Sequence, residues 1–308
     1  MSKVDVIGLG EVCIDWVAIV DHLPQPDEKV FAREYKLFVG GVTANFLVAL
    51  ARLGAKTAFI GGVGNDRYGN IVLNKLKKEG VDISKVKIWP NRSTAVNFLI
   101  VDREGTKVII QDMNLKNNVP DPKDIDLNFI LEAKALHITG IKPEASLIAM
   151  DVAYKSGIIT SFDLEKHVSD YGMDVLKPLL KRTNILLPNK LGLIALTREK
   201  DFIKAAKKLM KLGPNIVVIT LGEKGCLVVT EKDHFIVPAF KVKVVDTTGA
   251  GDAFNAGFIY AYVIRGENLR KAAIFANAVA ALKCIRYGAQ EGLPRKNEVD
   301  AFLSKMLS

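Results

Sequence analysis

The sequence predicts an α/β fold with a mainly parallel central sheet that is covered by helices on both faces. Continuous apolar runs rich in β-branched residues alternate with helical patterns along most of the chain. Such runs are typical of parallel strands, which are buried on both faces, and ligands of these sheets bind beyond the carboxyl ends of the strands. The runs expected as buried strands are 4–9, 58–63, 135–139, 158–162, 184–187 and 216–221.

Two regions break this alternation. Segments 12–20 and 30–38, and segments 94–101 and 107–110, look like strands with no helix between them. They predict a small separate sheet. Residues 102–105 fit a hairpin turn, with Gly105 free to take a positive φ. No linker is long enough to separate two independent domains, so residues 1–308 are expected to form one domain.

Composition sets further limits. A chain of 308 residues that is 49% hydrophobic and 25% charged can bury one large core. It contains no apolar run of about 18 residues and no cleavable apolar segment at its start, so a cytoplasmic location is expected. Cys13, Cys226 and Cys284 are too scattered to suggest disulfides or a metal site. The net charge of +9 comes from lysines spread over expected helix faces, so neither nucleic acid nor membrane is expected as a partner.

Residues 246–254 are the most informative part of the chain. They connect an expected strand, 242–245, to an apolar helix that begins near Ala250. Gly249, Ala250 and Gly251 have little or no side chain, so their N–H groups can face an anion at the positive end of a helix. Asp252 would lie beside that anion and could accept a proton from an attacking hydroxyl. The alternative is a tight turn in which Asp252 only favours the helix dipole.

A second block lies far away in the sequence. Gly40 and Gly41 permit close approach of the backbone to a ligand, and Asn45 offers both a donor and an acceptor. A helix-start turn with a solvated Asn45 is the alternative. Asp15 lies where the first core strand would pass into the small sheet. An ionised carboxylate there can accept two hydroxyl hydrogen bonds, or it can cap a turn.

With these two blocks the chain resembles the ribokinase-like (PfkB) family of sugar and nucleoside kinases over nearly its whole length. The resemblance implies a three-layer α/β/α fold with a lid formed by inserted segments at about 12–39 and 93–112. It implies an ATP-dependent kinase that uses Mg²⁺ and transfers the γ-phosphoryl group to a hydroxyl, with Asp252 as general base. A lid of this kind is often a dimer contact. An apolar face expected from Val12, Ile14, Val17 and Ile19 would favour a homodimer.

The resemblance also implies roles for further residues. The acceptor would be bound by Asp15, Gly40, Gly41 and Asn45, with polar contacts from Asn97 and Gln111 of the lid. The nucleotide would be bound by Asn189, Thr220, Gly222, Gly225 and Asn277. A monovalent cation, expected to be K⁺, would lie at Asp246, Thr248 and Gly288.

The chain departs from the family pattern in two places. Relatives carry a Glu three residues after the Asn at position 189, where this chain has Gly192. Glu165 could be recruited in its place, or Lys190 could neutralise phosphate charge directly. Ribokinase-type sequences carry Lys-Gly after the paired glycines, where Val42 and Thr43 stand here.

The acceptor therefore remains open. A small sugar is favoured. A nucleoside is the alternative, because Phe46 and Phe98 could stack a base. A sugar or nucleotide sensor without efficient catalysis is a further alternative, motivated by the missing acid at Gly192.

Overall fold

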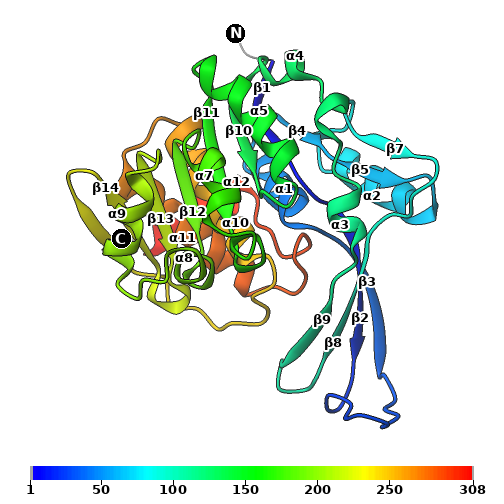
Figure 1. Cartoon of the computed structure of the whole chain (residues 1–308). Coiled ribbons are helices and arrows are strands. Elements are labelled where there is room, and N and C mark those ends of the chain that lie inside the picture. The colour runs from blue at the N-terminus through cyan, green and yellow to red at the C-terminus, as the bar shows by residue number, and fades with distance from the viewer. Residues whose placement is uncertain (1–2, 307–308) are drawn as a thin grey trace.

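The computed structural model describes residues 3–306 and confirms the predicted α/β class. A nine-stranded sheet in the order β15-β14-β13-β12-β11-β10-β1-β4-β6 lies between helices (Figure 1). The strands from β13 to β6 run parallel, whereas β14 and β15 are antiparallel. The strands are β1 (Val4–Leu9), β4 (Thr57–Ile60), β6 (Val81–Asp82), β10 (Ala133–Ile138), β11 (Ile159–Leu164), β12 (Ile185–Pro188), β13 (Ile216–Thr220), β14 (Cys226–Thr230) and β15 (His234–Val237).

Helices pack against both faces of this sheet. The helices that pack on one face are α1 (Val42–Arg52), α2 (Arg67–Lys78), α10 (Ala250–Ile259), its π-helical extension η3 (Tyr260–Ile264), α11 (Leu269–Cys284) and α12 (Lys296–Met306). The helices that pack on the other face are α3 (Asn114–Asn117), α4 (Leu127–Ile130), α5 (Pro143–Lys155), α6 (Lys166–Ser169), α7 (Met173–Leu180), α8 (Lys190–Thr197) and α9 (Phe202–Met210). Each face has its own hydrophobic cluster, because successive side chains of a strand, such as Val6 and Ile7, point to opposite faces. Short 3₁₀ turns occur at η1 (Pro122–Asp124) and η2 (Gly222–Lys224).

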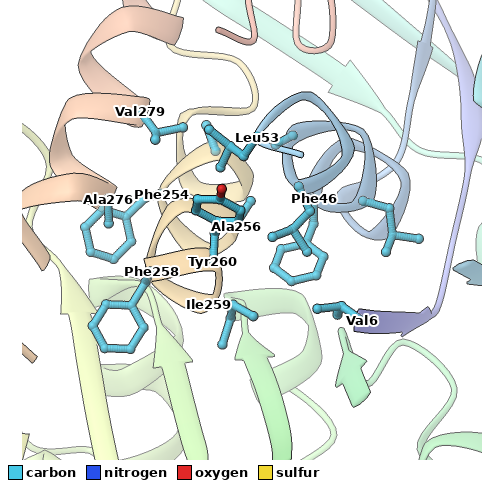
Figure 2. Packing of buried hydrophobic residues seen from close by; sticks show 14 of the residues in the cluster. Val6, Phe46, Leu53, Phe254, Ala256, Phe258, Ile259, Tyr260, Ala276 and Val279 are labelled. Carbon is cyan, nitrogen blue, oxygen red and sulfur yellow. The ribbon is translucent and has the colours of Figure 1, made fainter. Parts of the chain in front are cut away.

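The cluster around α10 fixes the part of the fold that matters most for the site. Figure 2 shows Phe46 of α1, Phe254 and Ile259 of α10 and Val279 of α11 meeting in this cluster. All four are buried. Small residues such as Ala256 and Ala276 let these helices approach closely. The start of α10 is thereby held against α1 and α11.

A four-stranded sheet in the order β3-β2-β8-β9 projects from the body of the molecule (Figure 1). It consists of β2 (Cys13–Ile19), β3 (Glu34–Gly40), β8 (Val96–Val101) and β9 (Lys107–Ile110), and we call it the lid sheet. The turn between β8 and β9 confirms the hairpin prediction, with Gly105 at φ 82° and its N–H donating to Asp102 O at 3.1 Å. A further pair, β5 (Gly62–Gly64) and β7 (Lys87–Trp89), lies beside the main sheet.

Two strand predictions were wrong. Residues 242–245 form no strand; instead, the N–H groups of Val245 and Asp246 donate to Cys284 O at the end of α11. A β-branched run becomes a strand only where a neighbouring strand is available to pair with it. The predicted strand 58–63 is divided, because the chain leaves the main sheet after Ile60 and pairs with β7 from Gly62.

The basis for the predicted apolar lid face was also wrong. Val12, Ile14 and Val17 are buried in the protein, although Ile19 is partly exposed. Other apolar side chains of the lid sheet are exposed instead, namely Tyr35, Phe98, Val108, Ile109 and Ile110. Among residues 3–306 no helix combines the length and the apolar character that a membrane span needs.

Candidate active site

Asp252 lies in the first turn of α10, as predicted, with Gly249 as the N-cap at φ 76°. Its side chain is buried, and Oδ2 accepts a hydrogen bond of 2.7 Å from Asn45 Nδ2. Asn45 is itself oriented by Gln290, whose Nε2 donates to Asn45 Oδ1 at 3.1 Å. The two predicted blocks therefore meet, and the chain of amides fixes the position of the Asp252 carboxylate.

The surroundings of Asp252 make it a stronger base than an exposed carboxylate. Burial, with a smaller contribution from the nearby Glu165 and Glu11 carboxyls, raises the pKa of Asp252 to about 8, against the lowering effect of the Asn45 hydrogen bond. A group whose pKa lies near neutrality is suited to proton transfer. Asp252 can therefore both hold and release a proton near physiological pH.

Two further acids were missed by the sequence analysis. Burial raises the pKa of Glu11 and of Asp163, whose side chains accept hydrogen bonds from Thr139 Oγ1 at 2.6 Å and from Asn255 Nδ2 at 2.9 Å. Both lie at or just after the carboxyl ends of parallel strands, β1 and β11. Acids at strand ends are the signal that could have identified them.

The loop before α10 brings together the three residues predicted to hold a monovalent cation. Asp246 Oδ1 accepts from Thr248 N and Asp246 Oδ2 from Gly288 N, each at 2.9 Å. Burial raises the pKa of Asp246, but these hydrogen bonds and the Lys283 ammonium outweigh it and lower the pKa overall. Asp246 is therefore ionised at neutral pH.

The same loop presents backbone N–H groups at the start of α10. The first N–H groups of a helix have no acceptor within it. Ala250 N donates to Thr247 O at 3.1 Å, whereas Gly251 is exposed, with no atom within 4 Å of the place where a Cβ would lie. Gly251 is therefore the most accessible of the three predicted anion-binding residues.

Asp15 faces this loop from the lid sheet. Asp15 Oδ1 accepts a hydrogen bond of 3.0 Å from Asn97 Nδ2 on the neighbouring strand. Burial raises the pKa of Asp15, although the hydrogen bonds from Cys13 and Asn97 oppose this shift. A Cβ at Gly40 would lie 2.2 Å from Asp15 Oδ2. At Gly41, φ is 98° and a Cβ would lie 2.6 Å from Val12 Cα. Both glycines are thus required for the lid to approach α1.

A cavity of about 380 Å³ lies between the lid sheet and the loop. Its lining includes Asp15, Phe38, Lys107, Asp246, Thr248, Tyr287, Gly288 and Ala289. The lid closes one side of it, because Lys107 Nζ donates to Thr248 Oγ1 at 3.3 Å. A cavity of this size has room for a single sugar-sized ligand.

Of the residues predicted to bind the acceptor, only Asp15 is part of the cavity lining. The lining does not include Gly40, Gly41, Asn45, Asn97 or Asp252. Gln111 is exposed and lies outside the lining. Phe46 is fully buried and stacks on His137 with ring centroids 3.7 Å apart, so the prediction that it stacks a base was wrong. Phe98 lies on the face of β8 opposite to Asn97, because neighbouring residues of a strand alternate, so it does not face Asp15. The argument from Phe46 and Phe98 for a nucleoside therefore does not hold, although two other aromatic side chains, Phe38 and Tyr287, line the cavity.

The predicted nucleotide-binding residues fall into two groups. Asn189 and Thr220 pair at the carboxyl ends of β12 and β13, and Gly222 follows at an open turn. Asn277 is buried, and its Nδ2 donates to Val237 O and Pro238 O at 3.1 Å each. Gly225 packs against the same segment, since a Cβ there would lie 2.0 Å from Val237 O. The first group lies at the carboxyl ends of two parallel strands, whereas the second positions the backbone after β15.

Position 192, where relatives carry the missing Glu, lies at the contact between α8 and the end of β11. Asn189 caps α8, and its Oδ1 accepts from Gly192 N at 2.7 Å. A Cβ at Gly192 would lie 2.3 Å from Leu164 O and 2.9 Å from Glu165 C. Helix α8 thus packs directly on the end of β11, next to Glu165, which is partly exposed and whose pKa is raised by desolvation. Lys190 points to solvent.

Comparisons with known proteins identify relatives of this chain over nearly its whole length. A family model described as "pfkB family carbohydrate kinase" matches residues 1–296. The chain is 32% identical to the ATP-dependent ribose-1-phosphate kinase of Halopiger xanaduensis, over 98% of this chain and 99% of that protein.

Solved structures agree with the sequence relatives. The crystal structure of ribokinase from Thermotoga maritima has a TM-score of 0.86 and 31% identity, covering 98% of this chain and 99% of that chain. A protein from E. coli described as ribokinase II, in complex with ATP and Mg²⁺, has a TM-score of 0.87 and 26% identity, covering 98% and 99%.

Proposed function

The chain belongs to the pfkB family of carbohydrate kinases and is a phosphotransferase with an alcohol acceptor, and we propose that it transfers the γ-phosphoryl group of ATP to a hydroxyl of a small sugar. The observation that carries this proposal is the buried Asp252 carboxylate in the first turn of α10, held by Asn45. Gly249, the cap of that helix, packs against Ala289 of the cavity.

The proposed reaction needs little covalent work from the protein. The acceptor hydroxyl oxygen forms a bond to the γ-phosphorus, the bond from that phosphorus to the bridging oxygen breaks, and ADP leaves with the electron pair. The hydroxyl proton passes to Asp252. Of the predicted anion-binding amides, the Gly251 N–H is the most accessible to the charge on the transferring group, since the Ala250 N–H already donates to Thr247 O. Asp15 and Asn45 hold and orient the acceptor.

A sugar is favoured over a nucleoside by the Asp15 carboxylate that lines the cavity. Asp15, supported by Asn97, offers carboxylate oxygens to hydroxyl groups, and neither Phe46 nor Phe98 is placed to stack a base. The ribose-1-phosphate acceptor of the Halopiger relative makes a phosphorylated sugar a reasonable candidate, and Lys107 at the cavity would carry the complementary charge.

The test is mass spectrometry of products after incubation with Mg·ATP and a panel of sugars, sugar phosphates, cyclic polyols and nucleosides. We expect one phosphorylated sugar product and, in an Asp15→Asn arm, a raised KM for that acceptor with a smaller change in the KM for ATP. A nucleotide product from a nucleoside would establish the alternative acceptor. Binding of a sugar without any product would establish the sensor.

Magnesium would be attracted to this site by the charge of nearby carboxylates and not held by a cluster of protein ligands. Within the described residues 3–306, no group of three or more His, Cys, Asp or Glu side chains is arranged to hold a metal ion. The ion would arrive on the ATP phosphates, whose charge it neutralises. We propose that Glu165 takes the role of the acid missing at Gly192, because the two positions adjoin and its charge also reaches Asp252.

Glu165→Gln should therefore raise the Mg²⁺ concentration that gives half-maximal rate by several-fold, since a neutral amide attracts the hydrated ion less strongly. Rates at buffered free Mg²⁺ measure this. Glu199→Gln, at a position just beyond α8, is the control. An unchanged Mg²⁺ dependence in Glu165→Gln would show that this carboxylate has no such role.

Two predictions from the sequence stay proposals. A homodimer through the lid sheet would cover exposed side chains such as Tyr35 and Phe98, and a monomeric mass in solution scattering would contradict it. The cytoplasmic location also remains a prediction, which fractionation of cells would check. Potassium at Asp246, Thr248 and Gly288 is left out of the proposed mechanism, because a lysine side chain enters that site.

A further inference from the structure

Lys283 is a fully buried lysine in the last turn of α11. Lysine is almost never fully buried unless it is paired, because moving an ammonium out of water is costly. Its Nζ donates to Asp246 O at 2.7 Å and lies 3.5 Å from Asp246 Oδ2. A positive charge is therefore fixed at Asp246, in the loop that precedes Asp252.

The partners of this ammonium belong to the predicted monovalent-cation site. Asp246 Oδ1 and Oδ2 also accept from Thr248 N and Gly288 N, so the residues of that site are held together around Asp246. Backbone carbonyl and carboxylate oxygens are the ligands that hard cations take in proteins. They are equally the acceptors of an ammonium group, a compact charge with three donors.

The fold makes room for the stem of Lys283. A Cβ at Gly292 would lie 3.2 Å from Lys283 Cε and 2.9 Å from Gly288 O. Cys284, the next residue of α11, also contacts the loop: its carbonyl oxygen accepts hydrogen bonds from Val245 N at 2.8 Å and from Asp246 N at 3.1 Å. The end of α11 therefore ties the beginning of the loop at several points.

We propose that the Lys283 ammonium occupies the site of the monovalent cation, so that this kinase positions its anion-binding loop with a built-in charge and needs no potassium. The inference rests on the proposed kinase function only for the role of the loop. A protein side chain cannot dissociate, so the loop would keep its geometry whatever ions surround the protein. Lys283 acts here as a positioning residue through Asp246.

The first experiment uses the wild-type protein. After exchange into potassium- and sodium-free buffer, its initial rate is measured against added KCl, with choline chloride at equal ionic strength as the reference. We expect rates within about twofold of each other. A tenfold or larger activation specific to KCl would overturn the proposal, and this result does not depend on how any variant folds.

The second experiment uses Lys283→Met, which keeps an unbranched stem without the charge, and Lys283→Ala, which opens space for an ion. In potassium-free buffer both should lose at least tenfold in kcat, and KCl should restore part of it in Lys283→Ala. KCl should also raise the melting temperature of Lys283→Ala relative to choline chloride, whereas wild type should not respond. Lys271→Met, an exposed position on the same helix, is the control and should match wild type.

Wild-type kcat in both Lys283 variants without potassium would contradict the role of the charge. The melting-temperature comparison needs no turnover. An absence of any product in the acceptor panel would therefore refute the proposed function, while a potassium response of Lys283→Ala alone would still support the cation site.

Discussion

Asp252→Asn should reduce kcat by a factor of about 100 to 10,000, because the amide cannot accept the proton of the acceptor hydroxyl. The fold should be retained, since an amide oxygen at this position can still accept the hydrogen bond from Asn45 Nδ2. Single-turnover rates with saturating Mg·ATP and acceptor would measure the effect. Asp174→Asn, an exposed acid in the first turn of α7, is the matched control and should keep the wild-type rate.

The pH dependence of the same variant gives an independent check. With the pKa of Asp252 raised to about 8, kcat/KM of the wild type should fall about tenfold per pH unit below that value, because only the ionised form accepts the proton. The residual activity of Asp252→Asn should lack this limb. An acidic limb that persists unchanged in the variant would assign the titration to another group.

Stability should move in the opposite direction to activity. Because the pKa of Asp252 is raised, the folded protein binds the proton of this carboxyl more tightly than the unfolded chain does. The contribution of the protonated Asp252 to the free energy of unfolding is therefore fully present below about pH 4 and is lost as the pH rises through about 8. Asparagine carries no such proton. The melting temperature of Asp252→Asn relative to wild type should therefore increase between pH 5 and pH 9, and a constant difference would contradict the burial of this charge.

Gly192→Glu, which restores the acid of the family pattern, should destabilise the protein and leave its activity unimproved. A Cβ there would lie 2.3 Å from Leu164 O, a backbone atom that cannot rotate away as a side chain can. Insertion of extra atoms into a well-packed site typically costs about 1 to 3 kcal/mol, and contact with backbone places this site at the upper end. Urea denaturation would measure the loss.

Leu191→Glu is the control for that substitution, because it adds the same charge at an exposed neighbouring position of α8. Its free energy of unfolding should stay within about 0.5 kcal/mol of wild type. Equal denaturation midpoints for Gly192→Glu and Leu191→Glu would show that α8 can move away from β11. In that case Glu165 would not be the only acid able to act at this place.

The sequence by itself determined the α/β class, the separate lid sheet and the loop of Asp252. Each of these depends on a local signal: the period of apolar residues, a turn glycine such as Gly105, or small residues at the start of a helix. Strand ends were predicted less well. Residues 242–245 have the composition of a strand, but pairing with a neighbour decides whether a strand forms, and composition does not contain that information.

The tertiary structure alone decided which distant side chains act together. Gln290, Asn45 and Asp252 form one hydrogen-bonded series although more than 200 residues separate Asn45 from each of the other two. Lys283 reads in the sequence as one more helix lysine, and only the packing of α11 on the loop buries its charge against Asp246. Burial and long-range pairing set the energies of charged groups, and neither has a local pattern from which it can be predicted.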